Sequence, residues 1–553
     1  MDNFPVVPQF NRAQFIGDIE RAIELPFNNS SDDAYLRERG IRYVIEAPIG
    51  MSLEDVRLLV REFLYSEFTV EPLFPDYSDS IPKENLKDFY LAFISGVSFS
   101  ALSQSPYNAA YELLARTPLL SVEPDKPYLQ FITTSSNVSA VSAPTDKAWS
   151  LRNMRVDSAW NIPPPSKGLK NGKGVSIAHL DTGWTDHQDL DQINFDYSRV
   201  LDLINPKNNA QDPLNYSGNP GHGTKTGSVI MSQGGVNNLS TTGPGQITGV
   251  AREVTYVPIR CIKSVVTIFN SDVARAIAHA TNKAKCDLIS MSLGGPPMKA
   301  LHVALKNATS KDLIAVCAAG NNVRTVVWPA RYPEAIAVAA SNCFDKPWSS
   351  SSRGKRVDIS APGEDVWKAE PDTKNSKVSP GSGTSYSTAN LAGVAALWIA
   401  FYEKSKLETV AHNSNSNLQE LFRSSIKSTA RKVSGWDNSK YGPGIVQAYN
   451  LLKATPQLVS NSDSNNQVMN NYSCVNNDDL FSRLVLKVCE FSILNSKTGT
   501  LDFFENELSH IILDFLDDAE SHIGLYKDLV SDVLYKIKNQ GSKALLSVLN
   551  MGE

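Results

Sequence analysis

The stretch GVSIAHLDTG, residues 174–183, begins as an apolar run and ends in an aspartate followed by a turn. Near-continuous apolar runs of this kind recur at TYVPIRCI (255–262), DLISMSLGG (287–295), LIAVCAAG (313–320) and AIAVAAS (335–341). Amphipathic helical patterns such as SDVARAIAHATNKAK (271–285) lie between them. Apolar strands that alternate with helices indicate an α/β fold with a parallel sheet covered on both faces.

In such sheets, functional sites form at the carboxyl ends of the strands. The first strand ends in Asp181, another ends in a glycine pair, and a third ends in Asn321. Taken alone, Asp181 would be an ordinary aspartate that starts a turn, and Asn321 would be a side chain that caps one. Only further motifs give these strand ends a chemical role.

Two glycine-flanked motifs, GHGTKTGSVI (221–230) and GTSYSTANLAG (383–393), each open a helical pattern. Alone, Ser385 fits a helix N-cap, and His222 fits a histidine that bonds to a backbone carbonyl. Together with Asp181 they occur in the order Asp, His, Ser. A serine hydroxyl is a weak nucleophile at neutral pH and needs both a base and a group that orients the base.

With DTG, GHGT, AAGNN and GTS in this order, residues 149–455 resemble a subtilisin-like serine protease, or subtilase. The α/β-hydrolases have a different order, and GTSYS lacks the second glycine of their GxSxG elbow. The resemblance implies a peptide-bond hydrolase that forms an acyl-enzyme, with Ser385 as nucleophile, His222 as base and Asp181 as the orienting carboxylate. It also implies Asn321 as an oxyanion donor beside the backbone N–H of Ser385.

The resemblance also assigns a substrate pocket. SMSLGG (290–295) is similar to the substrate-binding strand of the family. WPARYP (328–333) matches the base of the P1 pocket, and Val327 stands where relatives often have glycine, which predicts a shallower pocket. The alternative for SMSLGG is a plain strand that runs into a turn. The residues implied to line the pocket wall are Ser292, Leu293, Gly294 and Gly295.

The sequence departs from the family pattern near the nucleophile and the base. Tyr386, Ala389 and Asn390 stand where Met, Pro and His are usual, and Lys225 replaces the second histidine of GHGTH. None of these positions supplies a triad function, so the departures bear on packing and specificity.

Asp189 resembles an aspartate that binds structural calcium in many subtilases. Calcium takes several oxygen ligands, and the sequence does not assemble them, which favours a solvated loop carboxylate. The chemistry itself requires no cofactor.

Residues 41–125 carry a second pattern. A strand at 41–47 precedes a helix with Ser52 and Asp55 as a capping box, two strands, a helix that opens at Ser105–Pro106, and a last strand. This β-α-β-β-α-β order is typical of a ferredoxin-like domain. It resembles the inhibitory prodomain of subtilases, which implies an intramolecular partner released by a cut within residues 126–148. A permanently attached regulatory domain is the alternative.

Three segments near the end of the chain show apolar residues at helical spacing and predict a small helical bundle. Such faces usually form a core; docking of a protein partner is the sharper hypothesis. The expected faces consist of Phe504, Leu508, Ile512 and Phe515 on one helix and Leu525, Leu529, Val533 and Ile537 on another.

Length and two Ser/Asn-rich stretches predict how the 553 residues divide. We expect a prodomain-like domain with a leading helix at 1–131, a linker at 132–148, a peptidase domain at 149–457, a linker at 458–475 and a helical domain at 476–553.

The net charge of −5 and the lack of a long basic block argue against nucleic acid as a partner. The N-terminus resembles no signal peptide, and no apolar run is long enough to span a bilayer, which predicts a cytoplasmic protein without a membrane partner. The six cysteines form no metal-binding pattern. The sequence thus predicts an intracellular serine endopeptidase held as a zymogen or regulated by its flanking domains. One alternative is a catalytically silent subtilase fold that binds or regulates; another is a protease that responds to a signal.

Overall fold

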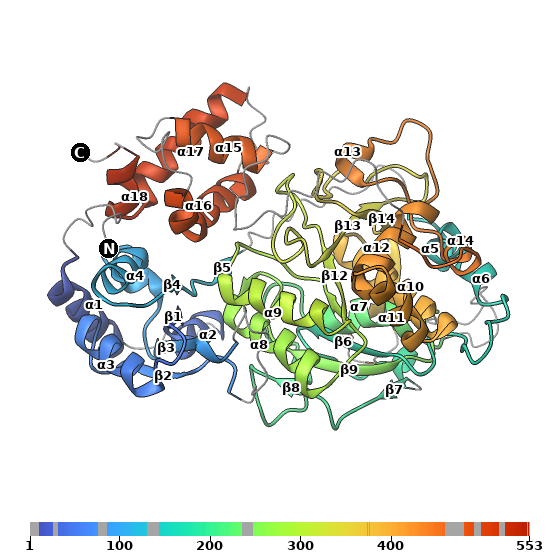
Figure 1. Ribbon diagram of the computed structural model, residues 1–553, viewed down its shortest axis with the longest axis horizontal. Helices are drawn as coiled ribbons and strands as arrows, with labels where there is room; N and C mark the ends of the chain where they lie inside the picture. Colours follow the sequence, from blue (N-terminus) through green and yellow to red (C-terminus); the bar gives the residue numbers. More distant parts are fainter. Residues whose placement is uncertain are drawn as a thin grey trace.

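The computed structural model of the protein describes residues 10–25, 31–75, 86–129, 143–191, 193–234, 247–372, 374, 377–458, 480–490, 499–518, 526–549 and 551. We call residues 10–129 the N-terminal unit, 143–458 the central unit and 480–551 the C-terminal helices. In Figure 1 the N-terminal unit lies beside the central unit, and the C-terminal helices lie above the N-terminal unit and the adjoining edge of the central unit.

The central unit is built on a parallel sheet, as the alternation of apolar runs and helical patterns predicts. Its strand order is β14-β13-β12-β11-β6-β9-β7, and β8 also pairs with β9. Because all these pairs are parallel, the carboxyl ends of the strands lie at the same end of the sheet. The strands are β6 (Ser176–Asp181), β7 (Asn194–Phe195), β8 (Leu201–Asp202), β9 (Thr255–Arg260), β11 (Leu288–Met291), β12 (Ile314–Ala318), β13 (Ile336–Ser341) and β14 (Ile359–Pro362).

Helices cover both faces of this sheet. Ala178 and Leu180 of β6 pack in one core with α8 (Asn270–Ala278) and α9 (Lys299–Ser310). Ile177 packs in a second core with α7 (His222–Met231) and α10 (Thr384–Tyr402). Since alternate residues of a strand share a face, His179 and Asp181 lie on the α7 and α10 side.

The remaining elements of the central unit surround the sheet. A short hairpin follows β14, and its strands pair antiparallel next to α7. These elements are α5 (Trp149–Asn153), α6 (Val156–Ala159), β10 (Thr267–Ile268), β15 (Val366–Glu370), β16 (Lys377–Gly381), α11 (Lys404–Asn413), α12 (Leu418–Thr429), α13 (Asn438–Tyr441) and α14 (Ala448–Lys453).

The N-terminal unit has the predicted ferredoxin-like arrangement. Its antiparallel strands lie in the order β2-β3-β1-β4, with α3 between β1 and β2 and α4 between β3 and β4. Ser52 and Asp55 form the expected capping box, and Ser105 caps α4. The elements are α1 (Arg12–Glu24), α2 (Ser31–Arg39), β1 (Ile41–Glu46), α3 (Leu53–Phe63), β2 (Thr69–Pro72), β3 (Phe89–Ile94), α4 (Pro106–Arg116), β4 (Ser121–Pro124) and β5 (Tyr128–Leu129).

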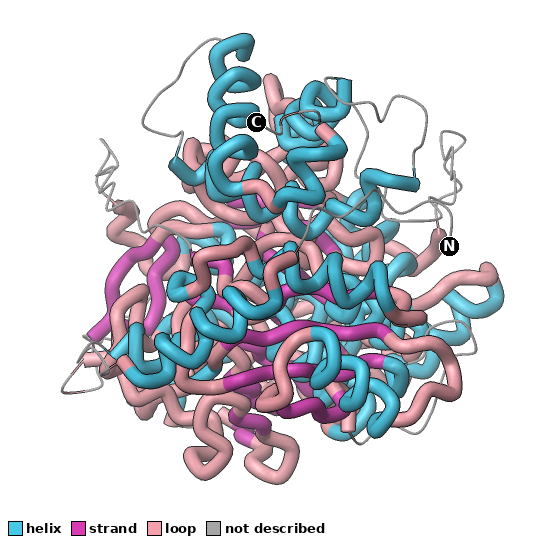
Figure 2. The backbone as a smooth tube through the Cα atoms, turned by 90° about the vertical axis from the view of Figure 1, so that its left-hand side faces the viewer, coloured by secondary structure: helices cyan, strands magenta, loops and turns pink. Residues whose placement is uncertain are grey.

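The C-terminal helices are α15 (Leu480–Glu490), α16 (Gly499–Asp518), α17 (Tyr526–Gln540) and α18 (Lys543–Val548). Their expected apolar faces are buried at Phe504, Leu508, Ile512 and Val533, whereas Leu525 lies outside the described residues. The tube view in Figure 2 shows these helices as a group at the top of the molecule. None of the described helices is long and apolar enough to cross a membrane.

The predicted linkers fall mostly outside the described residues, which stop at 129 and 458 and resume at 143 and 480. The domain boundaries therefore stay predictions. The three units nevertheless share one apolar core, which includes Val44 and Leu91 of the N-terminal unit, helices α8 and α9, and Phe504 and Ile512 of α16.

Candidate active site

The end of β6 and the start of α7 bring Asp181 and His222 together. Nδ1 of His222 lies 2.8 Å and 2.9 Å from the two carboxylate oxygens of Asp181. A side chain at Gly223 would overlap the carbonyl of Gly183, so the GHG motif allows this close approach. Burial alone would raise the pKa of Asp181, but the charge and hydrogen bond of His222 outweigh it and leave that pKa lowered. Asp181 is therefore ionised and fixes the orientation of the imidazole.

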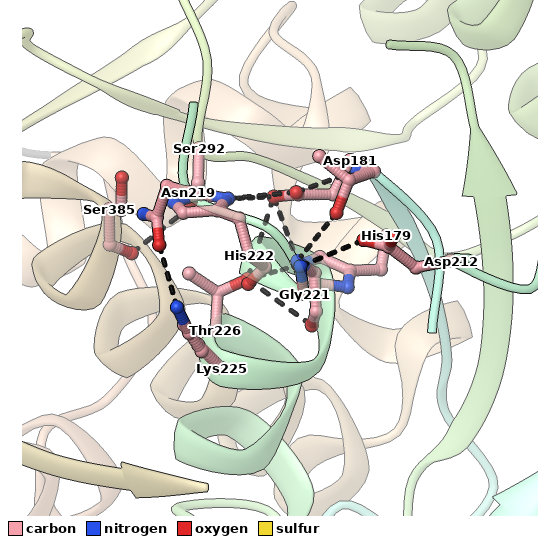
Figure 3. Close-up of polar contacts among 12 residues, drawn as sticks. His179, Asp181, Asp212, Asn219, Gly221, His222, Lys225, Thr226, Ser292 and Ser385 are labelled. Carbon is pink, nitrogen blue, oxygen red and sulfur yellow. Dashed lines mark hydrogen bonds and ion pairs between the residues drawn. The ribbon is translucent and has the colours of Figure 1, made fainter. Parts of the chain in front are cut away.

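Ser385 lies in the first turn of α10, and its position corrects the N-cap interpretation. The N-cap of α10 is Gly383, so Ser385 sits inside the helix. Ser385 and His222 line the same pocket, which has a volume of about 90 Å³. Figure 3 shows His222 between Ser385 and Asp181. The three side chains thus lie in the order Ser385, His222 and Asp181, the order that the family resemblance implies.

Asn321, at the end of β12, also lines this pocket. Its Oδ1 accepts hydrogen bonds from the backbone N–H of Thr384 at 3.0 Å and from the Thr384 hydroxyl at 2.9 Å. Because the backbone N–H can only donate, these contacts fix the amide orientation and leave Nδ2 as the donor beside the pocket. Asn321 therefore contacts the start of α10 rather than merely capping its own turn.

The implied pocket wall is present in part. Ser292, Leu293 and Gly294 line the pocket, and the Ser292 hydroxyl donates to the carbonyl oxygen of Ser385 at 3.0 Å. Gly295 is not a lining residue; its N–H donates to the carbonyl of Trp328 at 2.8 Å. Strand SMSLGG thus runs from the sheet into the pocket wall and then pairs with the WPARYP segment.

Residues 172–444 match the protein family described as "Subtilase family". The M-protease of Shouchella clausii (strain KSM-K16) is 31% identical over 340 residues, which are 60% of this chain and 78% of that protein. The chain belongs to the subtilase family. Subtilisin Savinase of Lederbergia lenta is 30% identical over 302 residues, covering 54% of this chain and 96% of that protein. The Major intracellular serine protease of Bacillus subtilis (strain 168) is 30% identical over 279 residues, covering 49% and 82%.

Since these relatives are named as proteases, the chain is a subtilisin-like serine endopeptidase. Two of its departures from the subtilase pattern, Lys225 and Asn390, make polar contacts. Nζ of Lys225 lies 2.7 Å from Oδ1 of Asn219 and 3.0 Å from a carboxylate oxygen of Glu370. Nδ2 of Asn390 donates to the carbonyl of Pro362 at 2.9 Å.

Several pocket residues of this subtilase were not identified from the sequence. Tyr386 was singled out only as a departure, yet it lines the pocket beside Ser385. Asn219 lies two residues before Gly221 of the GHG motif, and that proximity is the signal that could have found it. The other lining residues without a predicted role are Val265, Ala318, Gly320, Ser382, Gly383 and Thr384.

A second histidine lies behind the Asp181 carboxylate and was not identified from the sequence. His179 is 1% exposed, and its Nδ1 lies 3.0 Å from the Tyr256 hydroxyl. Its Nε2 lies 3.1 Å from the Thr226 hydroxyl, which also donates to the backbone carbonyl of His222 at 3.0 Å. Burial lowers the pKa of His179 to about 4, so the ring is neutral. Its position two residues before Asp181 on one strand face was the available signal.

Asp189 differs from its expected role as a solvated loop carboxylate. It is 3% exposed, and its Oδ1 accepts the backbone N–H of Ile247 at 3.1 Å. Burial raises its pKa to about 6. Its Oδ2 has no hydrogen-bond partner among the described residues. Among the same residues, no group of three His, Cys, Asp or Glu side chains could hold a metal ion. One buried oxygen does not make a calcium site, and the binding of calcium, which the sequence did not favour at Asp189, stays untested.

Proposed function

We propose that this subtilase cleaves peptide bonds with Ser385 as the nucleophile. The observation that carries this assignment is the pair of hydrogen-bond distances between His222 Nδ1 and the Asp181 carboxylate, at a pocket that His222 shares with Ser385. Asp181 occupies Nδ1, so Nε2 is the nitrogen that can take the serine proton.

The proposed reaction has two halves. Ser385 Oγ attacks the scissile carbonyl while His222 takes its proton, and the carbonyl oxygen becomes an oxyanion. Nδ2 of Asn321 and the backbone N–H of Ser385 donate to that oxyanion. His222 then protonates the leaving amine, and the acyl-enzyme remains. A water molecule, deprotonated by His222, attacks the ester and releases the acid and Ser385.

The proposal extends to regulation by the N-terminal unit. Its last described strand, β5, pairs antiparallel with β10, whose neighbour Val265 lines the pocket. An extended substrate would pair with such an edge, so β5 supports a blocking role. Pro144, on the far side of the connecting segment, accepts a hydrogen bond from the Trp367 indole at 2.8 Å. A cut within residues 126–148 would separate the N-terminal unit from the peptidase chain.

An intracellular location is part of the proposal. Two relatives have names that support it: the Intracellular serine protease of Paenibacillus polymyxa and the Major intracellular serine protease of Bacillus subtilis. Fractionation of cells that produce the chain, with immunodetection in cytosol and medium, tests the location. Recovery in the medium alone would contradict it.

The test of the enzymatic proposal is cleavage of a peptide library by the purified chain, compared with Ser385→Ala. A protease site designed into residues 132–142 allows the comparison before and after the connecting segment is cut. Cleavage by the parent and none by Ser385→Ala supports the assignment. If the cut parent cleaves no peptide even after its N-terminal fragment has been removed in urea below the unfolding transition, the assignment of Ser385 as nucleophile is wrong.

A further inference from the structure

One side chain of the C-terminal helices contacts both other units. Asn506 of α16 is 7% exposed, and its Oδ1 accepts the hydroxyl of Tyr107, on α4 of the N-terminal unit, at 2.7 Å. Its Nδ2 donates to the carbonyl of Pro297 in the central unit at 2.7 Å. Pro297 lies three residues after Gly294, a residue of the pocket wall. Asn506 therefore connects the N-terminal unit to the segment next to the substrate pocket.

Further buried contacts join α16 and α18 to α4. The Tyr107 hydroxyl also lies 2.9 Å from Nδ1 of His510, and the Tyr111 hydroxyl donates to Glu507 at 3.0 Å. Asn108 Oδ1 accepts the backbone N–H of Lys543 at 3.0 Å. These side chains are all buried. Removal of the N-terminal unit would leave several of these polar groups without their partners, which is costly in an apolar environment.

The C-terminal helices are also anchored to the central unit through α15. The ring of Phe481 packs edge-on against Trp328, with ring centroids 5.4 Å apart. Arg331 donates to the Ser482 hydroxyl at 2.8 Å, and its guanidinium lies 5.1 Å from the Phe481 ring. Figure 1 shows α15 and α16 above the boundary between the other two units. The helices are thus positioned to hold those units together.

The N-terminal unit also contacts the central unit directly. Arg42 pairs with both oxygens of Asp272 at 3.2 Å and 3.3 Å, and Glu123 accepts the backbone N–H of Lys299 at 2.9 Å. These contacts and those to α16 hold the same unit, so their effects on its dissociation multiply. The connecting chain is only one of three attachments.

We propose that the C-terminal helices hold the N-terminal unit on the peptidase after the chain between them is cut. A cut within residues 126–148 then leaves the N-terminal unit in place, and its release requires displacement of α16 from α4. This inference rests on the proposed function, because the retained unit matters only if it blocks a working site. It adds a second requirement for activation.

The test uses the full chain with Ser385→Ala and a designed protease site in residues 132–142. After the cut, an excess of the same N-terminal fragment carrying a fluorophore is added. The rate at which labelled fragment replaces the bound, unlabelled fragment gives the dissociation rate. The rate is measured at several urea concentrations below the unfolding transition. Tyr107→Phe removes only the hydroxyl that contacts Asn506 and His510, and Asn506→Ala removes the shared side chain. The matched control is Tyr90→Phe, whose hydroxyl bonds to the Met51 carbonyl within the N-terminal unit at 3.2 Å.

We expect Tyr107→Phe and Asn506→Ala to raise the dissociation rate by about five- to a hundredfold, as for loss of a buried hydrogen bond, and Tyr90→Phe to change it less than about twofold. Equal rates in the parent and in both interface variants would overturn the inference. The exchange measurement requires no catalytic activity. A negative result in it can therefore be distinguished from a failure of Ser385 to act as the nucleophile. Folding of each variant is checked by its thermal unfolding before the cut.

Discussion

Nε2 of His179 lies 3.9 Å from a carboxylate oxygen of Asp181, and the Thr226 hydroxyl lies 3.1 Å from the first atom and 3.5 Å from the second. The same hydroxyl bonds to the backbone of His222. Because His179 is neutral, it acts through hydrogen bonds and not through charge. This network ties the strand that carries Asp181 to the helix that carries His222.

The network predicts a catalytic effect of residues that do not touch substrate. His179→Val is expected to lower kcat roughly five- to tenfold with KM nearly unchanged. This corresponds to a rise of about 1 kcal/mol in the activation free energy when a hydrogen bond that positions Asp181 and His222 is lost. Thr226→Val should give a similar loss, and the double variant should fall short of the product of the two. Thr309→Val is the matched control, since its hydroxyl makes the same kind of i−4 bond, to the Leu305 carbonyl, in α9. Fully multiplicative losses would show that no network exists.

Asn321 is expected to act on the transition state. Asn321→Ala should lower kcat by about 10²- to 10³-fold with little change in KM, because the side chain donates to an oxygen that becomes charged only during the reaction. Steady-state kinetics on one peptide substrate measure both constants. Asn322→Ala, one residue later and outside the pocket lining, is the control. A change confined to KM would assign Asn321 to substrate binding instead.

Val327 is expected to limit the P1 side chain. It lines the pocket, and it lies so close to Gly294 that a side chain there would overlap it. Val327→Ala should shift cleavage toward larger apolar P1 residues, which profiling of cleavage products by mass spectrometry would detect. A parent enzyme that already prefers large aromatic P1 residues would contradict the shallow pocket.

Retention of the N-terminal unit is expected to depend on pH through Glu123. Burial raises the pKa of Glu123 to about 7, and the charges of Glu46 and Asp125 also raise it. The charge of Lys299 and the hydrogen bond from its backbone N–H oppose this shift. A carboxyl whose pKa is raised on docking favours the docked state when protonated. That stabilisation is complete below the ordinary carboxyl pKa and is lost as pH rises through about 7.

The N-terminal fragment of the cut chain should therefore dissociate faster at pH 8 than at pH 6. Glu123→Gln should remove part of this difference. Burial also raises the pKa of Glu507 to about 7, which acts in the same direction, whereas burial lowers the pKa of His510 to about 3, which acts in the opposite direction. Exchange of labelled fragment at the two pH values measures the effect. A rate that falls from pH 6 to pH 8 would contradict it.

The sequence predicted the sheet and the implied triad because both depend on local patterns. Apolar periodicity identifies the strands, and short glycine-flanked motifs place Asp181, His222 and Ser385 next to strand and helix ends. Helix α2 escaped prediction because its sequence SDDAYLRER has no apolar face; only Tyr35 contributes a buried hydrophobic side chain.

Contacts between distant segments could not be read from the sequence. Asp189 is buried because it bonds to Ile247, which lies far along the chain. Asn506 stands beside an apolar helical face, and only the packing of α16 on α4 gives its amide partners. Helical periodicity can be recognised from the sequence alone. The hydrogen-bond partners of a polar residue on such a helix depend on tertiary packing and cannot.

The identity of the nucleophile is the central claim, and covalent labelling tests it most directly. The chain is cut in residues 132–142, its N-terminal fragment is removed in urea below the unfolding transition, and the remainder is treated with a fluorophosphonate probe. Peptide mapping by mass spectrometry should place the label on Ser385, and both Ser385→Ala and His222→Ala should abolish it. Label on a different serine, or no label on folded protein freed of its N-terminal unit, would contradict the assignment.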